Sequence, residues 1–155
     1  MAGLTQVVAF RLDEERFAVT LSRVERIVRA VEITHLPDAP NTVHGVINVE
    51  GRIVPVINTR KRLGLPERDI DLNDLFVIVG GDGITLAFVA DEVLPVMDIT
   101  ETLLVSSPEV LPGRRFVQGI AETDNGMIML LDIDQALSYE EQDGLQRTAR
   151  ALSEE

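Results

Sequence analysis

The chain has 155 residues, and its composition of 45% hydrophobic and 26% charged residues is typical of one compact domain or two small lobes. A net charge of −12 disfavours nucleic acid and anionic membrane surfaces as partners, because both present negative phosphates. The absence of cysteine excludes disulfides, thiolate metal sites and a cysteine nucleophile.

The first part of the chain predicts strands. Aromatic residues make up only 4%, so the core must be built from Val, Ile and Leu, which favour β structure. Residues 7–12 alternate only weakly but predict a strand, and residues 17–21 alternate between apolar and polar side chains as a half-buried strand does. Residues 22–30 begin with a potential helix cap, Ser22, and predict one short helix or turn that leads into a strand. Residues 44–58 predict a β-hairpin, because two β-branched runs flank a short glycine-containing turn.

A short helix is expected directly after this hairpin. Residues 59–64 contain good helix formers, with Asn58 or Thr59 as the N-cap. Gly64 is placed to end the helix, because glycine readily adopts the left-handed conformation at a helix C-terminus. The polar residues 65–74 then predict a connector without regular structure.

Two further hairpins and a terminal helix are expected in the second part of the chain. Two apolar runs joined by a glycine-rich turn predict a hairpin over 75–99, and residues 116–133 predict another that turns at 124–126. From Asp134 onward, apolar residues at helical spacing predict a C-terminal helix, with a helical or frayed tail over 141–155.

The sequence contains an internal repeat. Residues 43–58 align with 117–132, and residues 16–27 resemble 83–96. The matched pairs are Val43 with Val117 and Gly45 with Gly119 at an offset of 74, Gly51 with Gly126 at an offset of 75, and Phe17 with Ile84 and Leu21 with Phe88 upstream. This alignment makes the second turn one residue longer. It predicts two similar small β lobes, over about 7–64 and 75–140, whose seam is a natural binding groove.

Side chains suited to catalysis or metal binding are few. His35 and His44 have no acidic residue at metal-ligand spacing, so no metal site is expected. The glycine-rich turn at 80–83 joins two strands and precedes no helix, so it is not a phosphate-binding loop. Asp91 and Asp132 both follow apolar strands, which keeps open a small hydrolase or ligand-binding barrel. A protein-binding module that needs no cofactor agrees better with the sequence as a whole.

The N-terminus and the hydrophobic runs predict a cytoplasmic protein. The first residues lack the basic start of a signal peptide. No apolar run reaches the roughly 20 residues that cross a bilayer, so no direct membrane insertion is expected.

Three stretches together resemble the CheW family of chemotaxis adaptors. They are FRLDEERFAVTLSRVERI, LPDAPNTVHGVINVEGRIVPVINTRKRLGL and FVIVGGDGITLAFVADEVLPV, in that order along the chain. The resemblance extends from residue 7 to about residue 140. Its most specific part is the proline-flanked run into the glycine-containing hairpin at 36–57.

The resemblance implies an all-β fold with short helices, in which two similar five-stranded SH3-like β-barrels pack together, followed by a C-terminal helix. It implies no enzymatic activity. Family members couple the cytoplasmic tips of chemoreceptors to a CheA-type histidine kinase, whose regulatory domain has the same fold. The receptor tip is a helical hairpin that docks into the groove between the barrels.

The resemblance also assigns residues to two surfaces. Those implied at the receptor-binding groove are Val24, Arg26, Ile27, Gly45, Val46 and Glu50. Those implied at the kinase-binding surface are Ile33, Thr34, Leu36, Arg52, Ile53 and Val54.

Two charges depart from the family pattern. Family members usually carry Arg where this chain has Glu50, and Glu where this chain has Arg26. Because both positions change in opposite senses, a swapped ion pair between Arg26 and Glu50 is the expected outcome. The departure leaves open a second function, in which the module recruits a different signalling protein and receptor binding is altered or lost.

Overall fold

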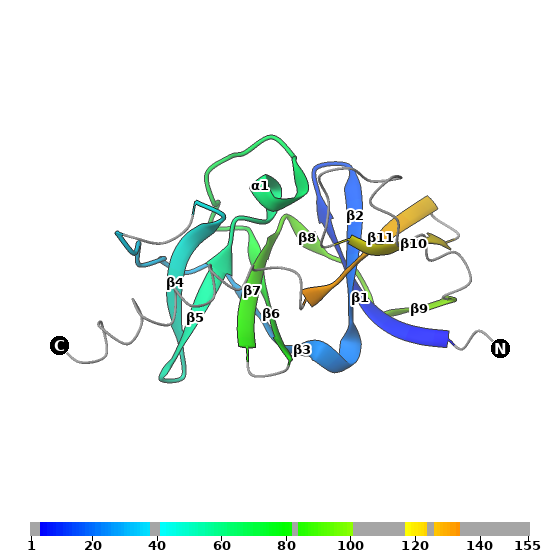
Figure 1. Cartoon of the computed structure of the whole chain (residues 1–155), viewed down its shortest axis with the longest axis horizontal. Coiled ribbons are helices and arrows are strands. Elements are labelled where there is room, and N and C mark those ends of the chain that lie inside the picture. Colours follow the sequence, from blue (N-terminus) through cyan, green and yellow to red (C-terminus); the bar gives the residue numbers. More distant parts are fainter. Residues whose placement is uncertain (1–3, 38–40, 82–83, 101–116, 124–125, 134–155) are drawn as a thin grey trace.

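The computed structural model describes residues 4–37, 41–81, 84–100, 117–123 and 126–133 (Figure 1). This part of the chain is mostly β structure, with a 3₁₀ turn at Leu21–Arg23 and the short helix α1 at Thr59–Leu63. The strands are β1 (Leu4–Leu12), β2 (Glu15–Thr20), β3 (Val24–Arg29), β4 (Val43–Val49), β5 (Arg52–Ile57), β6 (Leu75–Gly81), β7 (Ile84–Ala90), β8 (Glu92–Val93), β9 (Met97–Thr100), β10 (Val117–Thr123) and β11 (Gly126–Leu131).

The strands form two sheets that lie side by side in Figure 1. The terminal sheet has the order β10-β11-β2-β1-β8, and β9 also pairs with β1. The middle sheet has the order β3-β6-β7-β5-β4. Strands from the beginning and the end of the chain therefore share one sheet, and the two halves that the repeat suggested interleave.

The internal repeat corresponds to a repeated strand arrangement. In the terminal sheet, the hairpin β10–β11 lies with β11 parallel to β2, and Leu130 faces Ala18. In the middle sheet, the hairpin β4–β5 lies with β5 parallel to β7, and Val56 faces Ala87. The same two-hairpin unit therefore occurs twice.

The register corrects the alignment of the repeat. Val49 pairs with Arg52 and Thr123 pairs with Gly126, so the hairpins are equivalent at a constant offset of 74 and the second turn is not longer. Gly51 therefore matches residue 125 rather than Gly126. Upstream, the equivalence of Ala18 with Ala87 gives an offset of 69, whereas the matches of Phe17 with Ile84 and Leu21 with Phe88 were two residues out of register. The sequence alignment matched Gly51 with Gly126, but in the structure these two glycines occupy adjacent rather than equivalent positions of the two hairpins.

Strands β1, β6 and β7 are buried on both faces. Alternate residues such as Val8 and Phe10 enter a joint core that also receives Val77 and Val79 from the other sheet. The residues between them enter a separate core behind each sheet, as Ala9 does in the terminal sheet and Ile78 in the middle sheet. Burial on both faces requires near-continuous apolar runs, which is why these strands show little alternation in the sequence.

Three phenylalanines of the described part of the chain lie in the joint core. The rings of Phe10 and Phe17 lie 5.9 Å apart, and those of Phe10 and Phe88 lie 6.4 Å apart. All three side chains are fully buried, and each contributes about 1.5–3 kcal/mol through burial. Because Phe88 comes from the middle sheet and the others from the terminal sheet, this cluster holds the two sheets together.

The local predictions around β3 and α1 are confirmed with one exception. A 3₁₀ turn precedes β3, as the segment 22–30 predicted, but the expected cap was wrong, because Ser22 lies inside the turn and Thr20 is its N-cap. Asn58 caps α1, since its side chain accepts a hydrogen bond of 3.1 Å from the backbone N–H of Lys61. Gly64 ends the helix with φ of 74°. The predicted C-terminal helix lies outside the described residues.

The hairpin predicted over 75–99 is correct only in its first part. Strands β6 and β7 pair as expected, over Leu75–Gly81 and Ile84–Ala90. The chain then crosses to the terminal sheet, where β8 and β9 pair with β1. The crossover depends on contacts distant in sequence, which local patterns do not encode.

Gly45 allows the segment after β3 to reach β4. Thr34 and Val46 exchange two backbone hydrogen bonds of 2.9 Å. Gly45 has φ of 152°, and a Cβ atom there would lie 2.3 Å from the carbonyl oxygen of Thr34. Only glycine tolerates this approach. Because β3 and β4 are the two outer strands of the middle sheet, this contact brings its edges together.

Candidate functional site

The turn of the β4–β5 hairpin projects Glu50 into solvent. Glu50 and Gly51 are the two turn residues, with φ of 50° and 87°. Positive values at both positions define the primed turn that two-residue hairpins favour. The side chain of Asn48 stabilises the turn by accepting a hydrogen bond of 2.8 Å from the backbone N–H of Gly51. A glutamate at a left-handed position is unusual for this turn, so local conformation does not explain its presence.

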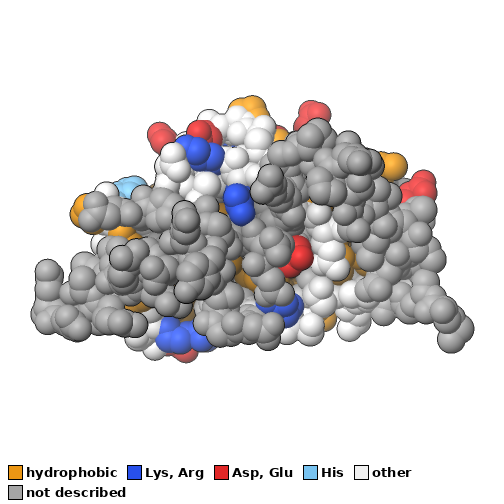
Figure 2. All heavy atoms as spheres, in the orientation of Figure 1, with side chains coloured by type: hydrophobic (Ala, Val, Ile, Leu, Met, Phe, Trp, Pro, Cys, Tyr) orange, Lys and Arg blue, Asp and Glu red, His pale blue; other side chains and the backbone are white. Residues whose placement is uncertain are grey.

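Two ion pairs join this hairpin to β3. Nη1 of Arg26 lies 3.1 Å from Oε1 of Glu50, so the two charges that depart from the family pattern meet in space. Beside them, Nη2 of Arg52 pairs with Oε2 of Glu25. On the face shown in Figure 2, described basic side chains lie beside acidic ones at the upper left and at the bottom left. No sequence pattern predicted the second pair, whose partners lie 27 positions apart.

The two ion pairs surround a small groove at one end of the middle sheet. Its volume is about 200 Å³, and its remaining lining comes from Val49 and Ile78. The Arg26 side chain is 44% exposed and that of Glu50 is 74% exposed. A docking partner therefore meets four charged groups that are only partly covered.

The structure separates the implied site residues by exposure. Six of them are exposed: Arg26, Ile27, Thr34, Glu50, Arg52 and Ile53. Two are half-buried, Val24 and Ile33. Gly45, Val46, Leu36 and Val54 are buried. The buried members can shape the surface from beneath but present no area to a partner. The implied receptor and kinase surfaces also meet at the hairpin turn, where Arg52 stands beside the Arg26–Glu50 pair.

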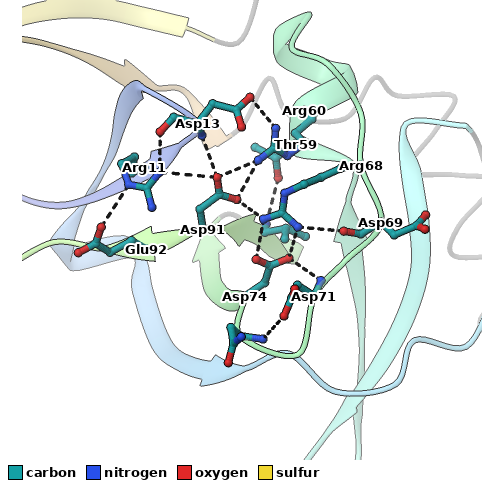
Figure 3. A network of polar contacts seen from close by, with 12 residues as sticks. Arg11, Asp13, Thr59, Arg60, Arg68, Asp69, Asp71, Asp74, Asp91 and Glu92 are labelled. Atoms are coloured by element: carbon teal, nitrogen blue, oxygen red, sulfur yellow. Dashed lines mark hydrogen bonds and ion pairs between the residues drawn. The ribbon is translucent and has the colours of Figure 1, made fainter.

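A second polar cluster lies between the two sheets (Figure 3). Its centre is Asp91, which stands between β7 and β8, where the chain crosses from the middle to the terminal sheet. Arg60 binds both carboxylate oxygens of Asp91, at 2.9 and 2.8 Å, and Arg68 binds one at 2.5 Å. The backbone N–H of Asp13, from the β1–β2 turn, donates to it at 2.8 Å. Sequence patterns did not predict this network, because its members come from four separate segments.

The environment of Asp91 does not suit a catalytic acid. Burial on its own would raise the pKa of this carboxyl group, but the N–H of Asp13 and the side chains of Arg60 and Arg68 hold the pKa below its usual value. A general acid needs the opposite shift. Both oxygens are already engaged by arginine, so the hydrolase that Asp91 and Asp132 left open finds no support here.

His35 and His44 line a larger depression of about 810 Å³ between residues 30–35 and 67–72. Nδ1 of His35 lies 2.9 Å from the backbone oxygen of His44, which only accepts, so this nitrogen carries a hydrogen. Burial lowers the pKa of His44, Glu67 opposes this shift, and His35 adds to it. Among the residues that the structure describes, no group of three or more metal-ligating side chains occurs.

The lowered pKa of His44 predicts a loss of stability in mild acid. Below about pH 6.5 the unfolded chain protonates this imidazole, while the folded chain does so only at lower pH. The free energy of unfolding should therefore decrease as the pH falls below about 6.5, and His44→Gln should flatten this slope. Urea unfolding at several pH values measures it. His35→Gln should keep most of the slope, because burial is the main cause; equal slopes for wild type and His44→Gln would contradict the assignment.

These features define a class of protein. The described residues present exposed charges and isoleucines around a two-sheet core, and Asp91 between the sheets is held by two arginines. No described helix has the length and apolar character needed to span a membrane. The molecule is a β-sheet interaction module.

Comparison with known proteins places this module in a family. The CheW-like domain model matches residues 6–141, so the chain belongs to the CheW family. The chemotaxis protein CheW of Thermotoga maritima is 32% identical over 132 residues, which cover 85% of this chain and 87% of that protein. The chemotaxis protein CheW of Treponema pallidum is 28% identical, covering 88% and 84%. The scaffolding protein TtCheW from Thermoanaerobacter tengcongensis superimposes with a TM-score of 0.78 at 30% identity, covering 90% of this chain and 91% of that one.

Proposed function

We propose that this chain is a non-enzymatic chemotaxis scaffold that couples the cytoplasmic tips of chemoreceptors to the regulatory domain of a CheA-type histidine kinase. The family match over residues 6–141 carries this proposal. It is supported by relatives named as chemotaxis proteins and by a similar structure described as a scaffolding protein. The protein would act in the cytoplasm and be recruited to membrane receptor arrays through its partners.

We further propose that residues 7–140 form one CheW-like domain in which each sheet closes into an SH3-like barrel. In the middle sheet, the Thr34–Val46 bridge and the two ion pairs join the outer strands β3 and β4–β5, as barrel closure requires. A helix that begins after Ile133, with a tail over 141–155, would complete the chain. Its support is the helical spacing of apolar residues in the sequence.

The receptor-binding surface is proposed at the exposed part of the implied groove, around Arg26, Ile27 and Glu50. Ile27 is 40% exposed and Ile53 is 41% exposed. Ile27 pairs with Val77, and Ile53 lies four positions before Ile57 on β5; Val77 and Ile57 both belong to the joint core. Because side chains alternate along a strand, both isoleucines lie on the face of the middle sheet that packs against the terminal sheet. An apolar surface beside the seam suits an amphipathic receptor helix.

The kinase-binding surface is proposed at the exposed residues Thr34, Arg52 and Ile53, together with the half-buried Ile33. Ile33 and Thr34 lie on the segment after β3, and Arg52 and Ile53 lie on β5. The Thr34–Val46 bridge keeps the segment after β3 close to the β4–β5 hairpin. Leu36 and Val54, which are buried, would support this surface without touching the kinase.

Affinity capture from a lysate of the source organism tests the function. The bait would be this chain and, in parallel, its Glu50→Arg variant, with bound proteins identified by mass spectrometry. Native chain should capture both a CheA-type kinase and chemoreceptors, and the variant should lose receptors while keeping the kinase. Capture of another signalling protein without kinase and receptors would contradict the proposal and favour the alternative of a recruiting module.

A double-mutant cycle measures the energy of the Arg26–Glu50 pair. Both side chains are largely exposed, so we expect a coupling of only about 0.2–1 kcal/mol in urea unfolding, which decreases at high salt. The swapped variant Arg26→Glu/Glu50→Arg should be more stable than the sum of its single changes predicts. Strict additivity would show that the two charges act independently.

A further inference from the structure

We propose that the Glu25–Arg52 ion pair is a second specificity-determining contact of the receptor-binding surface. It would select a receptor helix whose charges match the order of charges around the groove. This inference rests on the proposed receptor binding and adds to that surface Glu25, which no motif assigns, and Arg52, which the resemblance places on the adjoining kinase-binding surface.

The first observation is the crossed arrangement of four charges. Glu25 and Arg26 are neighbours on β3, and Glu50 and Arg52 flank Gly51 at the hairpin turn. Each acid of one segment pairs with the base of the other, and all four line the same groove. The group is neutral as a whole, so it discriminates between partners by the order of its charges rather than by net attraction.

The second observation is that β6 leaves room for the Glu25 carboxylate. A Cβ atom at Gly80 would lie 2.6 Å from Oε1 of Glu25. The Glu25 side chain therefore lies directly over the backbone of β6 as it reaches Arg52. The backbone of Gly80 is fixed in turn by Arg23, whose Nε donates to its carbonyl oxygen at 2.5 Å.

The third observation is that the pair is open to a partner. The Glu25 side chain is 38% exposed and that of Arg52 is 54% exposed. Ion pairs with this exposure add little to folding stability, because water and salt screen them. Their charges nevertheless remain accessible, and like-charge contacts against a wrong partner are strongly unfavourable.

The chemistry of the matching partner follows from this geometry. An acidic and a basic side chain three or four positions apart lie on one face of a helix. Such a helix can place its acid against Arg26 or Arg52, its base against Glu25 or Glu50, and its apolar residues against Val49, which also lines the groove. The occupant is therefore a chemoreceptor tip helix that carries both charges on its docking face.

A charge-swapped variant tests the inference, because it keeps the ion pair and reverses only its order. The affinity of Glu25→Arg/Arg52→Glu for the cytoplasmic tip fragment of a chemoreceptor from the same organism would be measured by titration calorimetry. We expect binding at least about tenfold weaker than wild type, with an unchanged urea midpoint. As a control, Glu122→Arg, an exposed position on β10 of the terminal sheet, should bind like wild type.

A second variant breaks the pair without changing any charge. Gly80→Ala should displace the flexible end of Glu25 from Arg52 and weaken receptor binding by about threefold to tenfold. Native affinity in the swapped variant, or in Gly80→Ala, would overturn the inference while leaving the proposed function intact. If the wild-type chain binds neither the receptor fragment nor the kinase regulatory domain, the proposed function and the inference both fail.

Discussion

Asp91→Asn is expected to lower the free energy of unfolding by about 3 kcal/mol, because it removes the anion from a buried cluster of charges. The side chains of Asp91 and Arg60 are only 12% and 9% exposed. Asparagine has nearly the same shape, but its amide group would direct hydrogen-bond donors at guanidinium groups that also only donate. The remaining partners of the arginines, Asp13 and Asp74, keep the expected loss at the lower end of the range for broken buried pairs.

Urea unfolding of the variant and of a matched control measures this effect. Glu92→Gln removes the neighbouring residue's charge, but the ion pair of Glu92 with Arg11 is exposed, at 57% and 37%. The control should therefore change stability by less than about 1 kcal/mol. An Asp91→Asn protein as stable as the Glu92→Gln protein would show that the cluster does not hold the two sheets together.

The same carboxylate predicts how stability responds to strong acid. Because its folded-state pKa is lowered, Asp91 contributes stability that is present above the unfolded value of 3.8 and is lost as the pH falls through the folded value. The difference between wild type and Asp91→Asn should therefore shrink below about pH 4. A constant difference down to about pH 2 would mean that ionisation of Asp91 does not produce the effect.

Local sequence patterns identified the elements that local interactions determine. The hairpin turn at Glu50-Gly51 and the helix at Thr59–Leu63 were predicted because turn residues and caps act within a few positions. The pairing of β8 and β9 with β1 was not predicted, because β7 continues into them with no signal that the chain changes sheet. Tertiary contacts fix the crossover instead, since Val93 of β8 packs against the joint core and Ile99 of β9 enters the core of the terminal sheet.

The candidate site was predictable in part, for a related reason. Arg26 and Glu50 were predicted to pair because both depart from the family pattern, and the structure brings them together. Glu25 and Arg52 follow no such pattern, and their contact depends on closure of the middle sheet and on the gap at Gly80. Gly45 and Val46 lie within the motif that carries the resemblance, yet they are buried. A sequence motif therefore marks residues that shape a surface together with residues that form it.

Gly45→Ala is the second substitution with a large expected effect, a loss of about 3–5 kcal/mol or failure to fold. The new methyl group would lie 2.3 Å from the backbone oxygen of Thr34, a group that cannot rotate away, and φ of 152° is itself unfavourable for alanine. Relief requires Thr34 to move, which breaks its two hydrogen bonds with Val46 and opens the contact between the sheet edges. Urea unfolding, or the soluble yield if the protein does not fold, measures the loss.

Gly51→Ala separates backbone strain from steric clash. Gly51 has φ of 87°, but no atom lies within 4 Å of the position that a methyl group would take, so alanine there should cost only about 1–2 kcal/mol. The difference in the free energy of unfolding between Gly45→Ala and Gly51→Ala then measures the cost of the steric clash with Thr34. Because Thr34 belongs to the proposed kinase-binding surface, a folded Gly45→Ala protein should also bind the kinase regulatory domain more weakly than Gly51→Ala does. Equal stability of the two variants would show that the Thr34–Val46 bridge adjusts freely and does not fix this edge of the sheet.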